Sequence, residues 1–526
     1  MAGWRSEEVE SVQCSVFSHE DGSEASLMNR YDHIVVGGGI SGLTAALLLA
    51  LNGRKVLLLE KAPRIGGSLA RFQRQGVPFD TGFHFTGGLL PDALLHRMLS
   101  VLGLLEAVEP EFMSSDRAHR FVFESENRAI EMPCGIAALR QKLKDEFPGE
   151  VVAVDRYFDL VEKVCAQTAT MDLTRLTESA HRLEEESVSL KTVLDGLTTS
   201  RLLRGVLCGL GMCYGVKPSE ISFASHSRVC YDLYQSTARF KGGGDALIDA
   251  FKQAFTRLGV EVRCNRWITE CRVAADDHAK SFILNSGEEV AAESAVLTIH
   301  PSHILKLLPR DHISKAFVSR VESFEASSGF FTVYGAWDGP AASGFGSSIV
   351  SLFPHTDFEQ LLDPAYRGEQ ALVICESVEP VRGAPRGVVT AFEPSFYEHV
   401  AQWGDSSLGH RPAAYGEYKA GRVEAIRERL ARYNPAYRGA CRILDAASML
   451  TYRDYLNSPD GSAYGIKQKV GQYNLIGKLP VRNLFAAGQS SLLPGIAGAM
   501  MSSFIVTRAV LGKDYFNRFV SGKLCS

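Results

Sequence analysis

The chain has 526 residues, which is enough for about three or four domains at roughly 150 residues each. Hydrophobic residues make up 45% of it and charged residues 22%, values that exclude a disordered or fibrous chain. The net charge of −4 excludes a general polycation that would hold nucleic acid. The 48 glycines exceed the usual share of about 7%. Where these glycines lie along the chain is therefore informative.

The two ends of the chain lack the patterns of secretion and of membrane insertion. Residues 1–29 are polar and acidic, without the basic start and apolar run of a secretory signal, and they predict a flexible N-terminal extension. No run of 18 residues is free of polar interruption, so we expect no spanning helix. Residues 494–512 come closest, but their serines, Thr507 and Arg508 favour a buried helix. We therefore expect a cytoplasmic protein.

Residues 31–61 follow the order strand, glycine turn, helix, strand. Residues 33–36 are β-rich, residues 43–51 favour a helix, and a second β-rich run over 55–59 closes on Glu60. The glycine turn has the pattern G-x-G-x-x-G and contains Gly37, Gly39, Ile40, Ser41 and Gly42. This pattern between a strand and a helix predicts a dinucleotide-binding site.

Each residue type in this segment has a physical reason. Gly37 allows a tight turn, Gly39 lets the backbone approach a pyrophosphate, and Gly42 lets the helix pack close to the sheet. The start of the helix offers free N–H groups and a partial positive charge to the phosphates. Glu60 stands where an acidic side chain hydrogen-bonds the hydroxyls of the adenosine ribose.

Two further glycine-rich segments follow the same logic. The first is a turn directly after the second strand, with Lys61, Arg64, Gly66, Gly67 and Ser68. The second lies near the other end of the chain, where the short β-rich run 484–487 leads into a glycine loop and an apolar helix. Its candidate residues are Gly488, Gln489, Gly495, Ile496, Gly498 and Ala499. Small residues here let the backbone approach a ligand closely.

The middle of the chain gives weaker signals. Residues 120–132 alternate like a strand pair, and helical patterns cover 135–146, 155–171 and 190–206. Residues 202–216 are unusually apolar and fit either a core helix, the wall of a substrate tunnel or a membrane contact. An amphipathic helix is expected within 240–259, a strand within 260–273, and a strand followed by a helix over 293–308. Residues 325–455 suggest a mixed sheet with many aromatic side chains.

The 11 cysteines are scattered, with no C-x-x-C spacing and no accompanying histidine cluster. We interpret them as reduced, buried thiols and expect no metal site.

Three segments resemble one family of flavoproteins. The glycine turn at 37–42, the R-x-G-G turn at 64–67 and the stretch 79–88 (FDTGFHFTGG) look like those of phytoene desaturases, carotenoid isomerases and retinol saturases, within the amine-oxidase-like flavoprotein superfamily. Residues 452–466 and the tail from Gly488 are similar as well. The histidine of the third segment, His84, resembles the saturase branch more than the bacterial desaturases.

The resemblance implies FAD as the cofactor, with the turn at Arg64 along its pyrophosphate and the last helix pointing at the pyrimidine ring of the flavin. It implies that the backbone near Ile268 meets the adenine. It also implies an α/β fold, in which a Rossmann-like FAD-binding domain is interleaved with a mixed-sheet and helical substrate domain. The expected division assigns residues 30–90, 225–310 and 451–526 to the FAD-binding domain and residues 91–224 and 311–450 to the substrate domain.

The implied substrate is a bulky lipophilic molecule such as an isoprenoid, carotenoid or retinoid, and the implied reaction is hydride transfer at a carbon–carbon double bond. His84 and Tyr464 are the candidate catalytic residues, because both lie in segments expected near the flavin. NAD(P)H or a quinone would serve as a transient electron partner. A flavin amine oxidase, with Lys241 as its lysine, a polyene isomerase using reduced FAD and a non-enzymatic flavoprotein escort remain alternatives. Peripheral membrane contact and the oligomeric state stay open.

Overall fold

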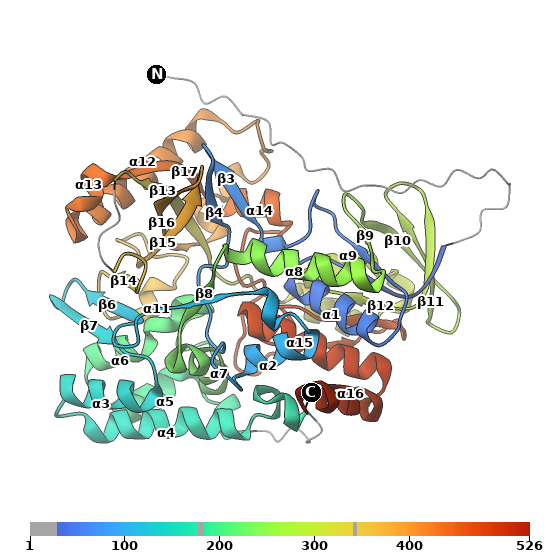
Figure 1. Ribbon diagram of the computed structural model, residues 1–526, viewed down its shortest axis with the longest axis horizontal. Coiled ribbons are helices and arrows are strands. Elements are labelled where there is room, and N and C mark those ends of the chain that lie inside the picture. The colour runs from blue at the N-terminus through green and yellow to red at the C-terminus, as the bar shows by residue number, and fades with distance from the viewer. Residues whose placement is uncertain (1–28, 177–182, 340–343, 526) are drawn as a thin grey trace.

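The computed structural model describes residues 29–176, 183–339 and 344–525. The N-terminal extension expected over residues 1–29 lies outside them, apart from Asn29, which begins the first strand. Two large sheets lie at opposite ends of the molecule, and helices pack against each of them (Figure 1). This arrangement confirms the α/β fold class expected from the sequence.

The first sheet is built on five parallel strands. In spatial order these are β9 (Glu261–Arg263), β2 (Val56–Leu59), β1 (Asn29–Val36), β12 (Glu289–Leu297) and β19 (Leu484–Ala486). Antiparallel strands β10 (Ile268–Val273), β11 (Ala279–Leu284) and β18 (Gly477–Lys478) extend it. The expected single strand within 260–273 is thus two strands, because Asn265 adopts a positive φ of 54° and turns the chain between them.

Helices bury both faces of this parallel sheet, as such sheets require. Along β1, Val35 packs against one face while Ile34 and Val36 pack against the other, since successive side chains of a strand point to opposite sides. The first face carries α1 (Ile40–Leu51), α2 (Leu94–Leu102), α8 (Gly243–Leu258), α15 (Gly495–Leu511) and α16 (Lys513–Cys525). The second carries α9 (Pro301–Leu307) and α10 (Lys315–Glu322).

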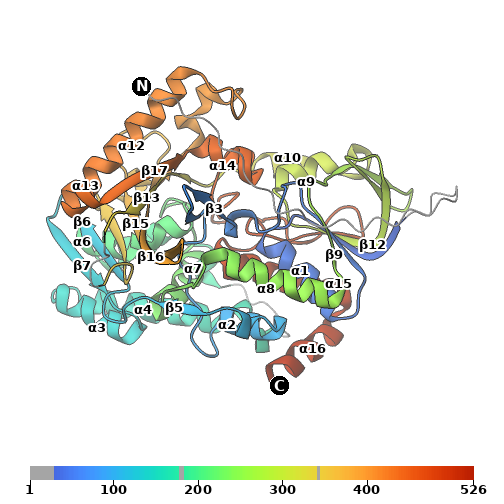
Figure 2. The ribbon, with the colours of Figure 1, turned by 45° about the horizontal axis from the view of Figure 1, so that its top comes forward.

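The second sheet has the strand order β17-β13-β16-β15-β14-β6-β7. The strands are β6 (His119–Phe123), β7 (Arg128–Met132), β13 (Gly329–Trp337), β14 (Ile349–Phe353), β15 (Leu372–Val381), β16 (Ala384–Ser395) and β17 (Cys441–Ala447). The strand pair expected over 120–132 is confirmed as β6 and β7. Helices α12 (Ala413–Tyr433) and α13 (Ala436–Ala440) cover the outer face of the sheet (Figure 2).

A layer of helices lies below the second sheet (Figure 1). It consists of α3 (Ile136–Glu146), α4 (Val151–Gln167), α5 (Leu190–Leu197), α6 (Arg201–Cys208) and α7 (Phe223–Gln235). The helix expected over 155–171 begins four residues earlier than predicted. The continuous helix expected over 190–206 is wrong, because the Ser200 hydroxyl accepts the Leu203 N–H and so starts a new helix. The apolar run 202–216 is mostly buried in this layer.

Shorter elements join the two parts. Strands β3 (Arg71–Arg74) and β4 (Val77–Asp80) form a hairpin, and β5 (Pro110–Phe112) pairs with β8 (Ala238–Phe240). Two short helices, α11 (Phe358–Leu361) and α14 (Met449–Leu456), flank the second sheet. The expected boundary at 90 assigns α2 to the substrate domain, but α2 packs against α1 and α15 beside the first sheet. The expected boundary at 225 falls inside α7, which packs in the helical layer beside the second sheet.

A buried ion cluster fastens the β3–β4 hairpin to the second sheet. The guanidinium of Arg71 lies 3.0 Å from Asp80 Oδ1 and 2.9 Å from Glu379 Oε1 on β15. The backbone N–H of Arg71 donates to Asp245 on α8 at 2.9 Å. Since α8 belongs to the first sheet's helices and Glu379 to the second sheet, one residue links both halves of the molecule.

Within the described residues, no helix combines the length and apolar character needed to cross a bilayer. The cysteines in this part of the chain form no disulfide. Groups of three or more His, Cys, Asp or Glu side chains arranged to hold a metal ion do not occur there either.

Candidate cofactor and substrate site

The glycine turn between β1 and α1 has the close contacts that its sequence predicts. A Cβ atom at Gly42 would lie 1.8 Å from the carbonyl oxygen of Gly37, so only glycine fits where α1 crosses the end of β1. Gly37 itself has a φ of +106°, which side chains rarely adopt. A Cβ at Gly39, in contrast, would meet no atom within 4 Å. The turn is therefore tightly packed on its protein side and open at Gly39.

Helix α1 begins directly at this open side. Gly39 is its N-cap, no side chain caps the helix, and its first turn contains no acidic residue. The first N–H groups of a helix have no acceptor within the helix and attract anions. Ile40 also lines the cavity described below. The hydroxyl of Ser41 points instead to α15, where it lies 2.7 Å from the Ser503 hydroxyl.

Glu60 follows β2 and lies beside the turn. Its carboxylate accepts the N–H of Gly38 at 2.5 Å and the N–H of Ala62 at 2.6 Å. Burial raises the pKa of this carboxyl, and the two backbone hydrogen bonds oppose that shift. Each carboxylate oxygen has more than one lone pair, so both can still accept a hydroxyl. Ile268 begins β10 nearby, where Arg266 donates its backbone N–H to the carbonyl of Glu60.

The second glycine turn packs on the first one. The N–H of Gly66 donates to the Gly38 carbonyl at 2.7 Å, and a Cβ at Gly67 would lie 3.3 Å from Gly39 Cα. Ser68 lines the cavity. Arg64 is exposed and its guanidinium donates to the backbone carbonyl of Arg71. Lys61 is also exposed, and its ammonium lies 5.7 Å from the ring centroid of Trp267.

The C-terminal glycine loop reaches the same place from the other end of the chain. Gly488 follows β19 with a φ of +127°, and its N–H donates to the Ser502 hydroxyl at 2.8 Å. Helix α15 then begins at Gly495, and neither a capping side chain nor an acidic residue occupies its first turn. The cavity wall includes Gln489, Gly495, Ile496, Gly498 and Ala499 from this segment. The loop thus brings a second uncapped helix start to the site.

These features fit FAD. Two uncapped helix starts, the open side of Gly39 and a buried carboxylate with spare lone pairs match the phosphate, flavin and ribose groups of that molecule. The hydrogen bonds between Ser41 and Ser503 tie the start of α1 to the middle of α15, although the residues are 462 positions apart.

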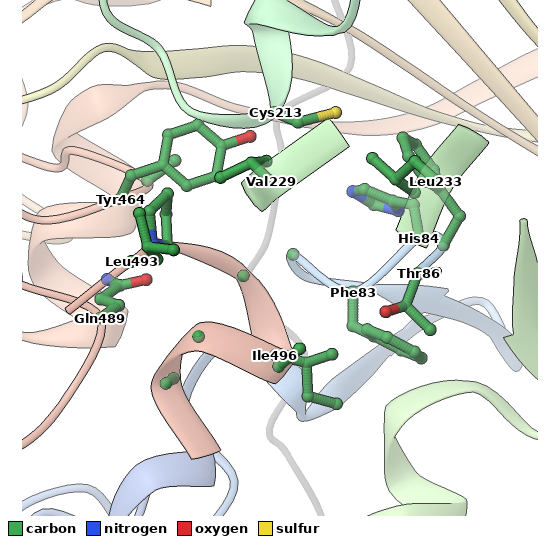
Figure 3. A pocket seen from close by; sticks show the side chains of 18 of the residues that line it. Phe83, His84, Thr86, Cys213, Val229, Leu233, Tyr464, Gln489, Leu493 and Ile496 are labelled. Atoms are coloured by element: carbon green, nitrogen blue, oxygen red, sulfur yellow. The ribbon is translucent and has the colours of Figure 1, made fainter. Parts of the chain in front are cut away.

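A cavity of about 260 Å³ lies next to the start of α15, between the two halves of the molecule. Its walls are mainly apolar and include Phe330 of β13, Phe392 of β16 and Leu210 from the segment after α6. In Figure 3, Tyr464 and Gln489 lie on one side of it, Phe83 and His84 on the other, and Ile496 of α15 below. The apolar run 202–216 therefore contributes to the cavity wall as well as to the core.

The structure places both candidate catalytic residues in this cavity wall. The ring of His84 stacks on Phe392 with centroids 5.0 Å apart, and burial lowers its pKa to about 4. An imidazole with that pKa is protonated in only about 0.1% of molecules at pH 7. The Tyr464 hydroxyl donates a hydrogen bond to the Met212 carbonyl at 2.7 Å, and burial raises the pKa of that hydroxyl well above its usual value. Both residues are thus weak proton donors at neutral pH.

The cavity wall differs from the sequence-based expectation at two residues. Lys241, the lysine considered for an amine oxidase, is exposed, lies 3.2 Å from Glu109 and is absent from the cavity wall. Sequence reasoning missed Asp232 on α7, which lines the cavity. The signal that could have found it is a carboxylate flanked by Val229 and Leu233 on the buried side of an amphipathic helix.

The comparison with known protein families agrees with this geometry. The family model described as flavin containing amine oxidoreductase matches residues 40–343. The chain belongs to this family. As a flavin-containing amine oxidoreductase, it is an FAD-dependent oxidoreductase, and the FAD expected from the glycine turns is confirmed at the level of the family.

Relatives of this chain include the all-trans-retinol 13,14-reductase of Danio rerio. It is 25% identical over 92% of this chain and 86% of its own length. The 4,4'-diapolycopen-4-al dehydrogenase of Metabacillus indicus is 24% identical over 70% of this chain and 76% of its own length. Among solved structures, a triple mutant of putrescine oxidase superposes with a TM-score of 0.63 at 16% identity, covering 93% of this chain and 99% of that one. The structural likeness concerns the fold.

Proposed function

We propose that the chain is a saturase that adds hydrogen across a carbon–carbon double bond of a conjugated, lipophilic polyene. The observation that carries the proposal is the mainly apolar cavity beside the start of α15, whose wall in the described residues contains no lysine. Retinol 13,14-reductases from three vertebrates each align with more than 90% of this chain, which supports the direction of reduction. The aligned dehydrogenase makes desaturation the competing direction, and the prolycopene isomerases that align with 30% of the chain support isomerisation.

The proposed roles of the site residues follow from their positions. When bound, FAD in its reduced form supplies the hydride equivalent. The N–H groups at the start of α1, beside the open side of Gly39, would bind its pyrophosphate, and Glu60 its ribose. Gly37 and Gly42 would give the turn its shape. The start of α15 would stabilise negative charge on the flavin ring. Apolar side chains exclude water from the reacting carbons.

The remaining candidate cofactor residues are proposed to contact FAD, without a separate role for each. They are Ile40, Ser41, Lys61, Arg64, Gly66, Gly67, Ser68, Ile268, Gly488, Gln489, Gly495, Ile496, Gly498 and Ala499. His84 and Tyr464 are proposed to orient the polyene rather than to act as acids. The imidazole of His84 is neutral at pH 7, and the Tyr464 hydroxyl donates a hydrogen bond to the Met212 carbonyl.

Several further properties belong to the same proposal. NAD(P)H or a quinone would reduce the flavin by docking transiently. A polyene substrate is dissolved in membranes, which supports peripheral membrane contact. The cytoplasmic location is part of the proposal. The proposed division into an FAD-binding domain (30–90, 225–310, 451–526) and a substrate domain (91–224, 311–450) is supported by the two larger sheets, because β1, β2 and β19 lie in one and β6, β7 and β13 to β17 in the other. The packing of α2 and α7 favours moving the boundaries at 90 and 225 beyond these helices.

The test is an anaerobic reaction with the purified holoprotein. Its flavin is first reduced chemically and then mixed with all-trans-retinol, with a quinone or with buffer alone. We expect retinol to reoxidise the flavin and to yield a product two hydrogen atoms heavier. Bleaching of the oxidised flavin by a primary amine would instead establish an amine oxidase. Release of a rearranged polyene with unchanged mass would establish an isomerase.

The cavity wall opposite α15 tests where the polyene lies. Cys213 lines the cavity, and burial raises the pKa of its thiol to about 12, so it is unreactive (Figure 3). Cys213→Trp should weaken retinol binding by about tenfold or more, because the larger ring overfills the space. The flavin content should stay that of the wild type. Fluorescence quenching measures the binding, and Cys525→Trp, at an exposed cysteine, is the control. Unchanged affinity in Cys213→Trp would place the polyene elsewhere.

A further inference from the structure

Asp232 has a carboxyl group without a partner in the cavity wall. It lies on α7, and a Cβ at the neighbouring Gly88 would come within 2.9 Å of its Oδ2. The glycines Gly87 and Gly88 end the FDTGFHFTGG stretch, so that stretch packs directly on this carboxyl. Within the described residues, its side chain forms no hydrogen bond and no ion pair. Asp232 is partly buried and faces the cavity. A carboxyl left unpaired in a mainly apolar cavity wall is costly, which is a reason to look for a function.

Of the charged and titratable groups around Asp232, Arg228 is paired with other residues and the rest are neutral. Arg228, one turn earlier on α7, lies 2.6 Å from Glu186 and donates to Thr168 at 3.0 Å. Cys165 on α4 is buried, and burial raises the pKa of its thiol, so it stays protonated. The neighbouring Tyr231 also has a raised pKa. His84, from the stretch that packs on α7, is neutral. Burial alone raises the pKa of Asp232 to about 6.

The other titratable groups of the wall hold their protons too tightly or carry none. His84 and His119 have pKa values lowered by burial to about 4, and so are deprotonated at neutral pH. The thiol of Cys213 and the hydroxyls of Tyr452 and Tyr464 have raised pKa values. An acid transfers a proton best when its pKa lies near the working pH. Among these groups, that condition is met by the unpaired carboxyl.

We propose that Asp232 is the proton donor in the reduction of the polyene. The inference rests on the proposed saturase function. The hydride equivalent from the reduced flavin forms a C–H bond at one carbon of the double bond, and the π electron pair forms the second C–H bond with the Asp232 proton. The O–H bond of the carboxyl breaks, its electron pair stays on the carboxylate, and water returns the proton. The substrate is reduced by two electrons and the flavin is oxidised.

The pH dependence has a definite sign. The protonated carboxyl is the active form, so the rate of flavin reoxidation by retinol should be highest below pH 6 and fall as the pH rises through about 6. Asp232→Asn keeps the shape of the side chain but donates no proton, so the rate should fall by about 10²–10⁴-fold and lose this pH dependence. Asp232→Glu should restore part of both. Asp249→Asn, at an exposed carboxylate on α8, should behave as the wild type.

Two measurements separate a chemical role from a structural one. Flavin content and retinol binding should be unchanged in Asp232→Asn. The infrared band of a protonated carboxyl in the oxidised holoprotein should titrate near pH 6 in the wild type and be missing in Asp232→Asn. A wild type that reduces retinol while Asp232→Asn keeps the same rate and pH profile would overturn the role of Asp232 alone. A wild type whose reduced flavin is reoxidised by quinone but not by any polyene would overturn the saturase function and this role with it.

Discussion

Gly39→Val should give a folded protein that purifies without flavin. The backbone of Gly39 has φ −76° and ψ 177°, an extended conformation that valine adopts readily. An added Cβ would meet no protein atom within 4 Å, so the side chain would fill the space proposed for the pyrophosphate. We expect FAD affinity to fall by about 100-fold or more, equivalent to about 2.7 kcal/mol. Flavin absorbance of the purified protein and titration with FAD measure this loss.

Two other glycines act as controls for this result. Gly421→Val, at an exposed position on α12 with open space around it, should retain full flavin content. Gly42→Ala should fail differently, because its Cβ would lie 1.8 Å from a backbone oxygen and disturb the packing of α1. A Gly39→Val protein with a full complement of flavin would show that the pyrophosphate does not lie at this turn.

Arg71→Met should lower the free energy of unfolding by about 3–5 kcal/mol, the usual effect of leaving buried charges unpaired. Arg71 is 6% exposed, and its loss leaves Asp80 and Glu379 without their cation. Urea denaturation followed by circular dichroism measures the change. Arg427→Met, at an exposed pair with Glu424, should cost no more than about 1 kcal/mol. Equal stability of the two variants would contradict the role given to the cluster.

The pH dependence of the Arg71→Met effect follows from Asp80. Burial raises the pKa of Asp80 to about 6, although the charge of Arg71 lowers it. A carboxyl with a raised folded-state pKa favours the folded state at low pH and disfavours it as the pH rises through that value. Removing Arg71 raises the pKa further. The stability difference from the wild type should therefore be larger at pH 8 than at pH 5.

The sequence predicted those parts of the site whose geometry is local. The turn from Gly37 to Gly42 needs only the spacing of a strand, three glycines and a helix, so its contacts could be expected before the fold was known. The same holds for the C-terminal loop, because Gly488 follows a short strand and precedes an apolar helix. The family resemblance supplied the choice of FAD.

The parts that depend on distant contacts could not be predicted in this way. Asp232 is separated from Gly88 by more than a hundred residues, and its missing partner becomes visible only when α7 packs on that glycine. The strand order of the second sheet, in which β6 pairs with β14, is likewise set by tertiary packing. The break at Ser200 was missed because a capping serine also fits the interior of a helical pattern.

The position of β19 has a consequence for how the protein is made. This strand pairs with β12 in the first sheet, but a ribosome adding 5–20 residues per second needs about 20–90 s to cover the roughly 450 residues between β1 and β19. During that time the β12 edge and the apolar face of α1 that packs against α15 lack their final partners. Newly made chains should therefore be vulnerable to aggregation and depend on chaperones until their last strand has emerged.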